Sequence, residues 1–372
     1  MKSRICILLA VLVLPLLVWA QDTADLAVVH RIKAEAFENS KVMDHMFYLT
    51  DVYGPHLPNT PAFEQVSDWA IKRMQEYGFE NAHKEKWGPF GRGWSYTRFS
   101  AHLIEPQYAP LIGFPISWTG STDGAVQGAP VLAVLRTEED LAKFKGQLKG
   151  KIVLTEPARE LGIPTKALAS RLTDAELEEV AMAPAPGTVA PAYGLLRLPA
   201  QAAHPAAVFR GKLYQFLKDE GVLAAVMPSL AGDGGVVFAP RGGSRESKGA
   251  LLPPMVALAS EHYNRLARLL DKKIPVRIEL QVETKVHEQT LDSYNVIAEI
   301  PGGRKRDEVV MLGGHLDTWQ GGTGATDDAV GCAVMMEAAR ILKALDLKMD
   351  RTIRVALWSA EEQGLLGSRA YV

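Results

Sequence analysis

The stretch Val309-Val310-Met311-Leu312-Gly313-Gly314-His315-Leu316-Asp317 decides the fold, because an apolar run typical of a buried strand ends at an imidazole and a carboxylate. A second apolar run, 352–359, ends in the same way at Glu361 and Glu362. Between the two runs, a glycine-rich loop leads to Asp327-Asp328. Polar side chains at the carboxyl ends of neighbouring strands share one edge of a sheet, so we expect these residues to form a single site.

The segment that contains these residues alternates between strands and a helix. We expect strands at 296–300, 309–313 and 352–359, a turn at Pro301-Gly302-Gly303 and a helix at 328–345. Alternation of this kind predicts an α/β fold with a parallel sheet.

The N-terminal third of the chain has helical patterns. Residues 24–53 predict one or two helices. A better-defined helix begins after Thr60, which suits the N-cap, carries Pro61 in its first turn and ends at Gly78. Apolar residues at helical spacing give this helix one buried face: Phe63, Val66, Ala70, Met74 and Tyr77.

The middle of the chain has a different pattern, with short β-rich runs separated by Gly and Pro and with helical pieces between them. This pattern predicts an inserted α+β domain at 118–284. His204 and His262 are isolated within it, so it offers no catalytic cluster. An Ala/Pro-rich stretch at 182–205 predicts a long loop.

The charge and the N-terminal pattern exclude several classes of protein. The chain has 41 basic and 43 acidic residues, so there is no basic field to attract nucleic acid. Lys2 and Arg4, an apolar run at 5–19 and Ala20 are typical of a signal peptide cleaved after Ala20. We therefore expect a secreted or periplasmic protein with no membrane segment after cleavage.

Only two cysteines are present. Cys6 would leave with the signal peptide, so no intramolecular disulfide would remain in the chain described here. Cys332 lies in an apolar run and is expected to be a small core residue.

Each motif taken alone has an ordinary explanation, since His315-Leu316-Asp317 suits a polar loop and Asp327-Asp328 suits the cap of a helix. Their combination is more specific. Asp317 lies two residues after His315 in an extended segment, so it can orient the imidazole while the other ring nitrogen binds a metal. The adjacent carboxylates of Glu361 and Glu362 suit a metal ligand and a general base, because cation charge and mutual repulsion separate their proton affinities.

Together the motifs resemble the active site of the M28 family of zinc aminopeptidases and carboxypeptidases, and most of all its carboxypeptidase Q branch. The resemblance covers nearly the whole chain after the signal peptide. It implies a three-layer α/β/α exopeptidase core, incomplete at the C-terminus, with an inserted protease-associated domain. The expected divisions are a signal peptide at 1–20, a helical part of the catalytic domain at 21–117, the insert at 118–284 and the rest of the catalytic domain at 285–372.

Carried over to this sequence, the family pattern implies two zinc ions. His315 would bind the first ion, Glu362 the second, and Asp327 would bridge both. Glu361 would be the general base and Asp317 would orient His315. The implied reaction is hydrolysis of a terminal bond in a peptide or dipeptide by a metal-activated water.

The sequence departs from the family after Glu362. Family members supply a further Asp to the first zinc and a His to the second from later segments, and 365–372 contains neither. Two protein ligands for each zinc are too few for a tight tetrahedral site. We therefore expect this chain to be a fragment of a longer protein, lacking two metal ligands.

Other functions remain open. A non-catalytic module that binds a peptide or partner is the first alternative, and glutaminyl cyclisation is the second. The sequence contains no His-Glu-x-x-His, no Gly-x-Ser-x-Gly and no Walker A loop. It leaves open which peptide end is trimmed, which side chain is preferred and whether the protein is a homodimer.

Overall fold

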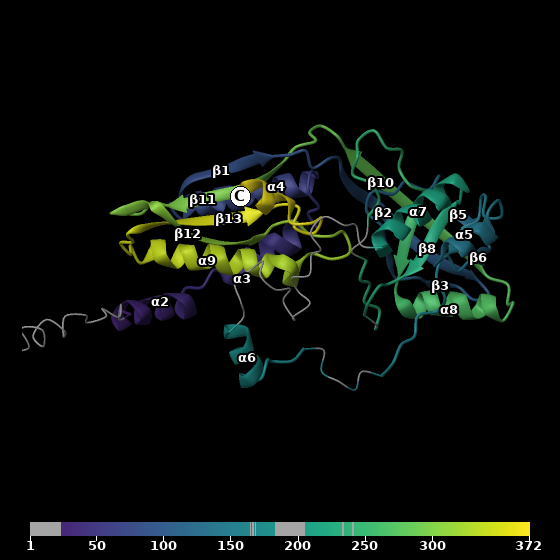
Figure 1. The fold of residues 1–372 in the computed structure, drawn as a ribbon, viewed down its shortest axis with the longest axis horizontal. Coiled ribbons are helices and arrows are strands. Elements are labelled where there is room, and N and C mark those ends of the chain that lie inside the picture. Colours follow the sequence, from purple (N-terminus) through teal and green to yellow (C-terminus); the bar gives the residue numbers. More distant parts are fainter. Residues whose placement is uncertain are drawn as a thin grey trace, which may run out of the picture.

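The computed structural model describes residues 24–163, 165, 167, 169–182, 205–232, 234–239 and 242–372. The expected signal peptide, His204 and nearly all of the Ala/Pro-rich stretch lie outside these residues. The described chain forms two bodies that lie side by side (Figure 1). Among the residues described, no helix is long and apolar enough to cross a membrane.

The first body is built on a four-stranded sheet. In spatial order its strands are β1 (Glu80–Trp87), β11 (Ser293–Ile300), β13 (Arg351–Trp358) and β12 (Lys305–His315). Only β12 and β13 are parallel, so the prediction of a parallel sheet is wrong for the other pairs. The link from β11 to β12 spans only 301–304, which is too short for the crossover that parallel strands need, and the chain reverses direction there.

Helices lie on both faces of this sheet, which confirms the α/β fold class. On one face, α4 (Pro61–Glu76) and α9 (Val330–Ala344) share a buried core with the sheet. Thr60 caps α4 as predicted, since its side chain accepts a hydrogen bond from the Phe63 N–H at 3.2 Å. On the other face lies α10 (Leu366–Tyr371), where the Tyr371 ring packs edge-on against Trp358.

The N-terminal helices lie against α9. As predicted for 24–53, they comprise α2 (Leu26–Glu38), then α3 (Val42–Phe47), which continues into the π-helix η2 (Tyr48–Val52). The buried Arg340 of α9 joins α2 to α9, because its guanidinium donates to Glu35 of α2 at 2.8 Å. Glu337, on α9 itself, accepts from Arg340 at 2.7 Å and from the Lys41 N–H, just before α3, at 3.0 Å.

The second body contains two further sheets. One sheet has the order β3 (Ala109–Pro110), β2 (Gly93–Glu105), β10 (Arg277–His287) and β5 (Val126–Gly128). The other has the order β4 (Gly113–Pro115), β9 (Met255–Leu258), β8 (Ala224–Pro228), β7 (Ile152–Leu154) and β6 (Pro130–Leu132). Because β2 pairs along its length with β10, residues 93–115 lie with this body, whereas the expected insert begins at 118.

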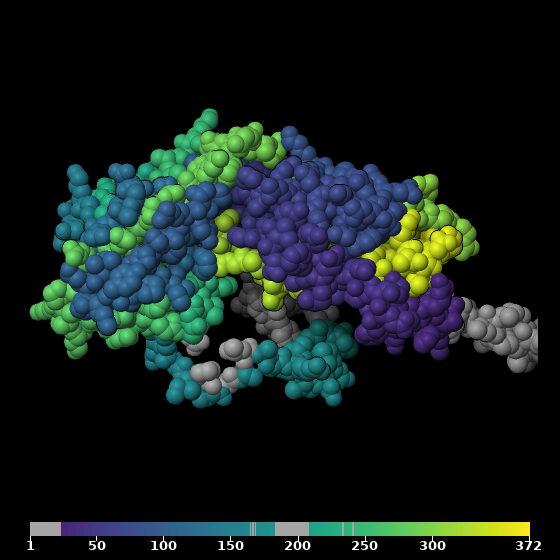
Figure 2. Space-filling view, turned by 180° about the vertical axis from the view of Figure 1, so that it is seen from behind, coloured from purple at the N-terminus to yellow at the C-terminus, as the bar shows by residue number. Residues whose placement is uncertain are grey.

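Four helices accompany these sheets: α5 (Glu138–Phe144), α6 (Asp174–Ala181), α7 (Pro205–Asp219) and α8 (Ser260–Asp271). No residue of α6 is buried, and this helix stands apart from both bodies (Figure 2). His262 on α8 has a structural contact, since its Nδ1 accepts the Ile112 N–H at 2.8 Å.

The two bodies meet at an aromatic cluster. Trp94 and Trp118 of the second body are buried with Leu57 and Ala360 of the first. The Trp118 ring packs edge-on against Trp319, with 6.1 Å between the ring centroids. This contact holds the second body beside the strand ends of the first sheet.

Candidate active site

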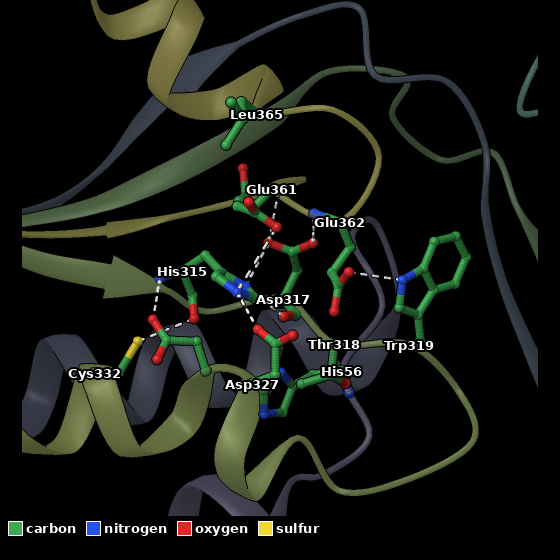
Figure 3. Close-up of polar contacts among 12 residues, drawn as sticks. His56, His315, Asp317, Thr318, Trp319, Asp327, Cys332, Glu361, Glu362 and Leu365 are labelled. Atoms are coloured by element: carbon green, nitrogen blue, oxygen red, sulfur yellow. Dashed lines mark hydrogen bonds and ion pairs between the residues drawn. The ribbon is translucent and has the colours of Figure 1, made fainter. Parts of the chain in front are cut away.

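The predicted site residues meet at the carboxyl ends of β12 and β13. These strands are parallel neighbours, and His315 pairs with Trp358 at their last position. The residues that follow each strand therefore leave the sheet at the same place. Asp327 arrives from the short π-helix η4 (Ala325–Ala329), and its carboxylate faces His315 (Figure 3).

His315 is almost fully buried, and its two ring nitrogens have different partners. Nδ1 lies 3.0 Å from the main-chain oxygen of Asp317, and Nε2 lies 2.8 Å from Oδ1 of Asp327. Oε2 of Glu361 is also near Nε2, at 3.8 Å. If Nδ1 donates to the carbonyl, Nε2 is directed toward the carboxylates, which is the orientation a metal-binding imidazole requires.

The Asp317 carboxylate is fully buried and supports the turn that carries the two glutamates. Its Oδ1 accepts the Glu361 N–H at 3.0 Å and its Oδ2 accepts the Glu362 N–H at 3.3 Å. Its distance to Nδ1 of His315 is 3.7 Å, longer than a hydrogen bond. The sequence predicts that this carboxylate orients His315, but the closer contact to the ring comes from the Asp317 main chain.

The adjacent acids Asp327 and Asp328 point in different directions. The Asp327 side chain is 74% exposed and faces His315. The Asp328 carboxylate points into the body, where it accepts the N–H groups of His315 and Gly331, each at 3.1 Å. The peptide bond between the two acids is cis. Asp328 therefore ties the end of β12 to the start of α9.

Two contacts of the site involve residues outside the three sequence motifs. The Trp319 indole N–H donates to Oε2 of Glu362 at 2.8 Å (Figure 3). The buried Asn295 side chain accepts the Ser359 N–H at 3.1 Å and donates to the Gly367 carbonyl at 3.0 Å, which holds both ends of the glutamate turn. A tryptophan directly after His315-Leu316-Asp317-Thr318 was the one available hint of the first contact.

Cys332 has the core position that the sequence predicts. It is fully buried on α9, and its thiol donates to the main-chain oxygen of His315 at 3.1 Å. Burial raises the pKa of the thiol well above its usual range, so it stays protonated and serves packing.

Crowded carboxylates shift the ionisation of the site. Burial, followed by repulsion from Asp327 and Asp317, raises the pKa of Glu362 to about 7. Burial also raises the pKa of Glu361, although the nearby His315 opposes this shift. Burial alone would lower the pKa of His315, but the carboxylates of Asp317 and Asp327 outweigh it and raise that pKa to about 10. The site thus has an excess of negative charge that favours bound cations.

The donor types fit zinc, since one imidazole and three carboxylates lie close together. Within the described part of the chain, however, no three His, Cys, Asp or Glu side chains are arranged to hold an ion. His315 Nε2 lies at hydrogen-bond distance from Asp327, and Glu362 accepts a hydrogen bond from Trp319. These residues therefore supply part of a zinc donor set.

A larger cavity, of about 720 Å³, lies away from these residues, between η2 and α4. Its lining mixes aromatic rings with Asp68, Lys72, Arg73 and Glu76 and contains no residue of the three motifs. The chemistry therefore favours the smaller pocket beside Glu362, of about 210 Å³.

Comparison with known proteins agrees with this geometry. Residues 295–372 match the model of peptidase family M28. Human carboxypeptidase Q is 36% identical over 330 residues, which cover 88% of this chain and 60% of that protein. Carboxypeptidase Q of Pongo abelii is 27% identical over 331 residues, with the same coverage. The chain thus spans about 60% of the length of these relatives.

Solved structures show the same fold. The crystal structure of a peptidase M28 precursor from Shewanella amazonensis is 26% identical and superimposes with a TM-score of 0.60, covering 93% of this chain and 69% of that one. A zinc aminopeptidase from Bacillus subtilis, 18% identical, has a TM-score of 0.50 and covers 89% and 63%, a likeness of fold alone. Residues 295–372 therefore match peptidase family M28, in a chain similar over most of its length to carboxypeptidase Q.

Proposed function

We propose that this protein is a secreted, zinc-dependent exopeptidase that hydrolyses terminal bonds of peptides or dipeptides. The observation that carries the proposal is the meeting of His315, Asp327, Glu361 and Glu362 at one edge of the M28 sheet. The similarity to carboxypeptidase Q supports a peptide-bond hydrolase. The signal-peptide pattern at 1–20 supports export.

In this proposal His315 would hold one zinc ion and Glu362 a second. Asp327, the most exposed of the three side chains, would be the ligand shared by both ions. Bound zinc supplies a Lewis acid and lowers the pKa of a coordinated water. Further ligands are needed to complete both sites, and the described residues near the site do not supply them.

The remaining acids have separate roles in this proposal. Glu361 would take a proton from the attacking water, since its carboxylate lies 3.8 Å from Nε2 of His315 and, within the described residues, accepts no main-chain hydrogen bond. Asp317 is a positioning residue that holds the backbone of Glu361 and Glu362. The second body corresponds to the protease-associated insert, with 93–115 included because β2 pairs with β10.

Zinc content and dipeptide hydrolysis test the proposal, measured on the protein as its gene encodes it. We expect about two zinc ions per chain, loss of hydrolysis after chelation and recovery when zinc returns. Peptide binding without turnover, in protein loaded with zinc, would favour the binding module. A peptide with N-terminal glutamine serves as the control for cyclisation, and cyclisation in place of hydrolysis would also overturn the proposal.

A further inference from the structure

A pocket of about 210 Å³ opens directly beside Glu362 and Asp327, and its walls come from both bodies. The first body supplies Trp319 and the glycine-rich loop after it, and the second supplies residues 237–239. The two loops approach closely, because a side chain at Gly321 would lie 3.9 Å from the Val237 carbonyl oxygen. The second body therefore reaches into the candidate active site.

Hydrogen bonds hold the backbone of residues 237–239, the part of the second body that lines the pocket. Phe238 donates its N–H to Oγ of the buried Ser229 at 2.7 Å, and its carbonyl accepts the Leu230 N–H at 2.9 Å. Val237 and Ala239 pack against the core of the second body. Phe238 as a residue, in contrast, is 52% exposed, and it lines the pocket. A fixed backbone thus presents an open aromatic ring to the site.

In the proposed function zinc would occupy the carboxylates of Asp327 and Glu362, and the rest of the lining, which includes Val237, Phe238, Ala239 and Trp319, favours an uncharged, apolar group. The described lining contains no Lys or Arg, so an acidic side chain would find no cationic partner there. The indole N–H of Trp319 is already used by Glu362. The volume is below the roughly 300 Å³ at which pockets begin to take drug-sized ligands. A single side chain of a substrate is therefore the occupant that fits.

We propose that Phe238, supplied by the second body, is a specificity-determining residue that selects peptides with an apolar side chain next to the scissile bond. This inference rests on the proposed exopeptidase function. It assigns to the second body a role in substrate choice, in addition to its packing against the strand ends.

The test compares kcat/KM of the zinc-loaded protein for the dipeptides Leu-Ser, Ser-Leu, Glu-Ser, Ser-Glu and Ser-Ser. Phe238→Ala should reduce the leucine-over-serine preference about tenfold while Ser-Ser hydrolysis stays within about twofold. Val236→Ala is the matched control, because Val236 is an exposed apolar residue of the same loop whose side chain lies against Gly232 and does not line the pocket. Phe238→Arg should raise hydrolysis of a glutamate dipeptide about tenfold by adding the missing cation.

Binding to a Glu361→Gln protein, measured by calorimetry, separates this inference from the proposed function. A loss of leucine-dipeptide affinity in the Phe238→Ala variant would support the role of Phe238 in the pocket, whether or not the protein hydrolyses dipeptides. If the unmodified protein hydrolyses no dipeptide, that absence of hydrolysis overturns only the exopeptidase function. An unchanged leucine preference, or a parallel loss for all five dipeptides, would overturn the role of Phe238 while hydrolysis by the unmodified protein still stands.

Discussion

Two groups of acids lie within the same site and differ in what their oxygens bond to. The floor, Asp317 and Asp328, directs its carboxylates to main-chain N–H groups of the surrounding turns. The rim, Asp327, Glu361 and Glu362, faces His315 and the pocket, and among the described residues its side chains lie close to His315 and Trp319. The floor is therefore part of the architecture, whereas the rim keeps oxygens available for a ligand.

The difference has an electrostatic consequence. A buried carboxylate is tolerated when hydrogen bonds replace the lost water, which the floor acids achieve through the backbone. At the rim, burial and then repulsion from Asp327 and from the floor acid Asp317 raise the pKa of Glu362 to about 7. Strongly shifted acids in a pocket are a mark of functional sites. Predictions that replace single residues of the floor and of the rim test this distinction.

The largest expected effect is on catalysis, at the rim. Glu361→Gln should lower kcat by about a hundredfold to ten-thousandfold, because the amide cannot accept a proton from water. Zinc content and the free energy of unfolding should stay nearly unchanged, since this side chain supports no backbone. Glu362→Gln is the contrasting variant and should lose zinc. If the Glu361→Gln variant retains turnover, Glu361 is not the general base.

At the floor the expected effect is on stability. Asp317→Ala should reduce the free energy of unfolding by about 3 kcal/mol, because two partly buried N–H groups lose their acceptor. Asp317→Asn keeps one acceptor oxygen and should cost about half as much. The measurement is urea unfolding in the presence of a chelator, so that loss of metal does not contribute.

Asp307→Ala is the control for this series. Asp307 is an exposed aspartate on the same strand, β12, and its replacement should change the free energy of unfolding by less than about 0.5 kcal/mol. If Asp317→Ala is equally mild, then Asp317 belongs with the rim and the comparison fails.

The site could be predicted from the sequence where it depends on strand ends. The apolar runs of β12 and β13 each stop at polar residues, and a parallel pair brings such ends together. The direction of β11 was missed, because alternation of elements does not reveal that 301–304 is too short for a crossover. The insert at 118–284 stays a prediction, and the pairing of β2 with β10 joins segments that no local pattern connects.

The division into floor and rim could not be predicted from the sequence, for a different reason. Whether the carboxylate of Asp317 reaches His315 or the glutamate backbone depends on the turn at 360–362, where Ala360 has a φ of 55°. Alanine rarely adopts a positive φ, so the motif Ala360-Glu361-Glu362 does not predict this conformation. Likewise, Phe238 and Trp319 line one pocket only because the two bodies pack together.

The smallest expected effect lies between floor and rim, at Trp319. Trp319→Phe keeps a ring against Trp118 but removes the N–H that Glu362 accepts, and should weaken the affinity for the zinc held by Glu362 about tenfold. Competition with a chelator measures this affinity. Trp118→Phe is the matched control, because its N–H bonds to the Arg92 carbonyl and touches no rim acid. It should cost stability without changing zinc affinity, and equal zinc loss in both variants would mean that Trp319 acts through packing alone.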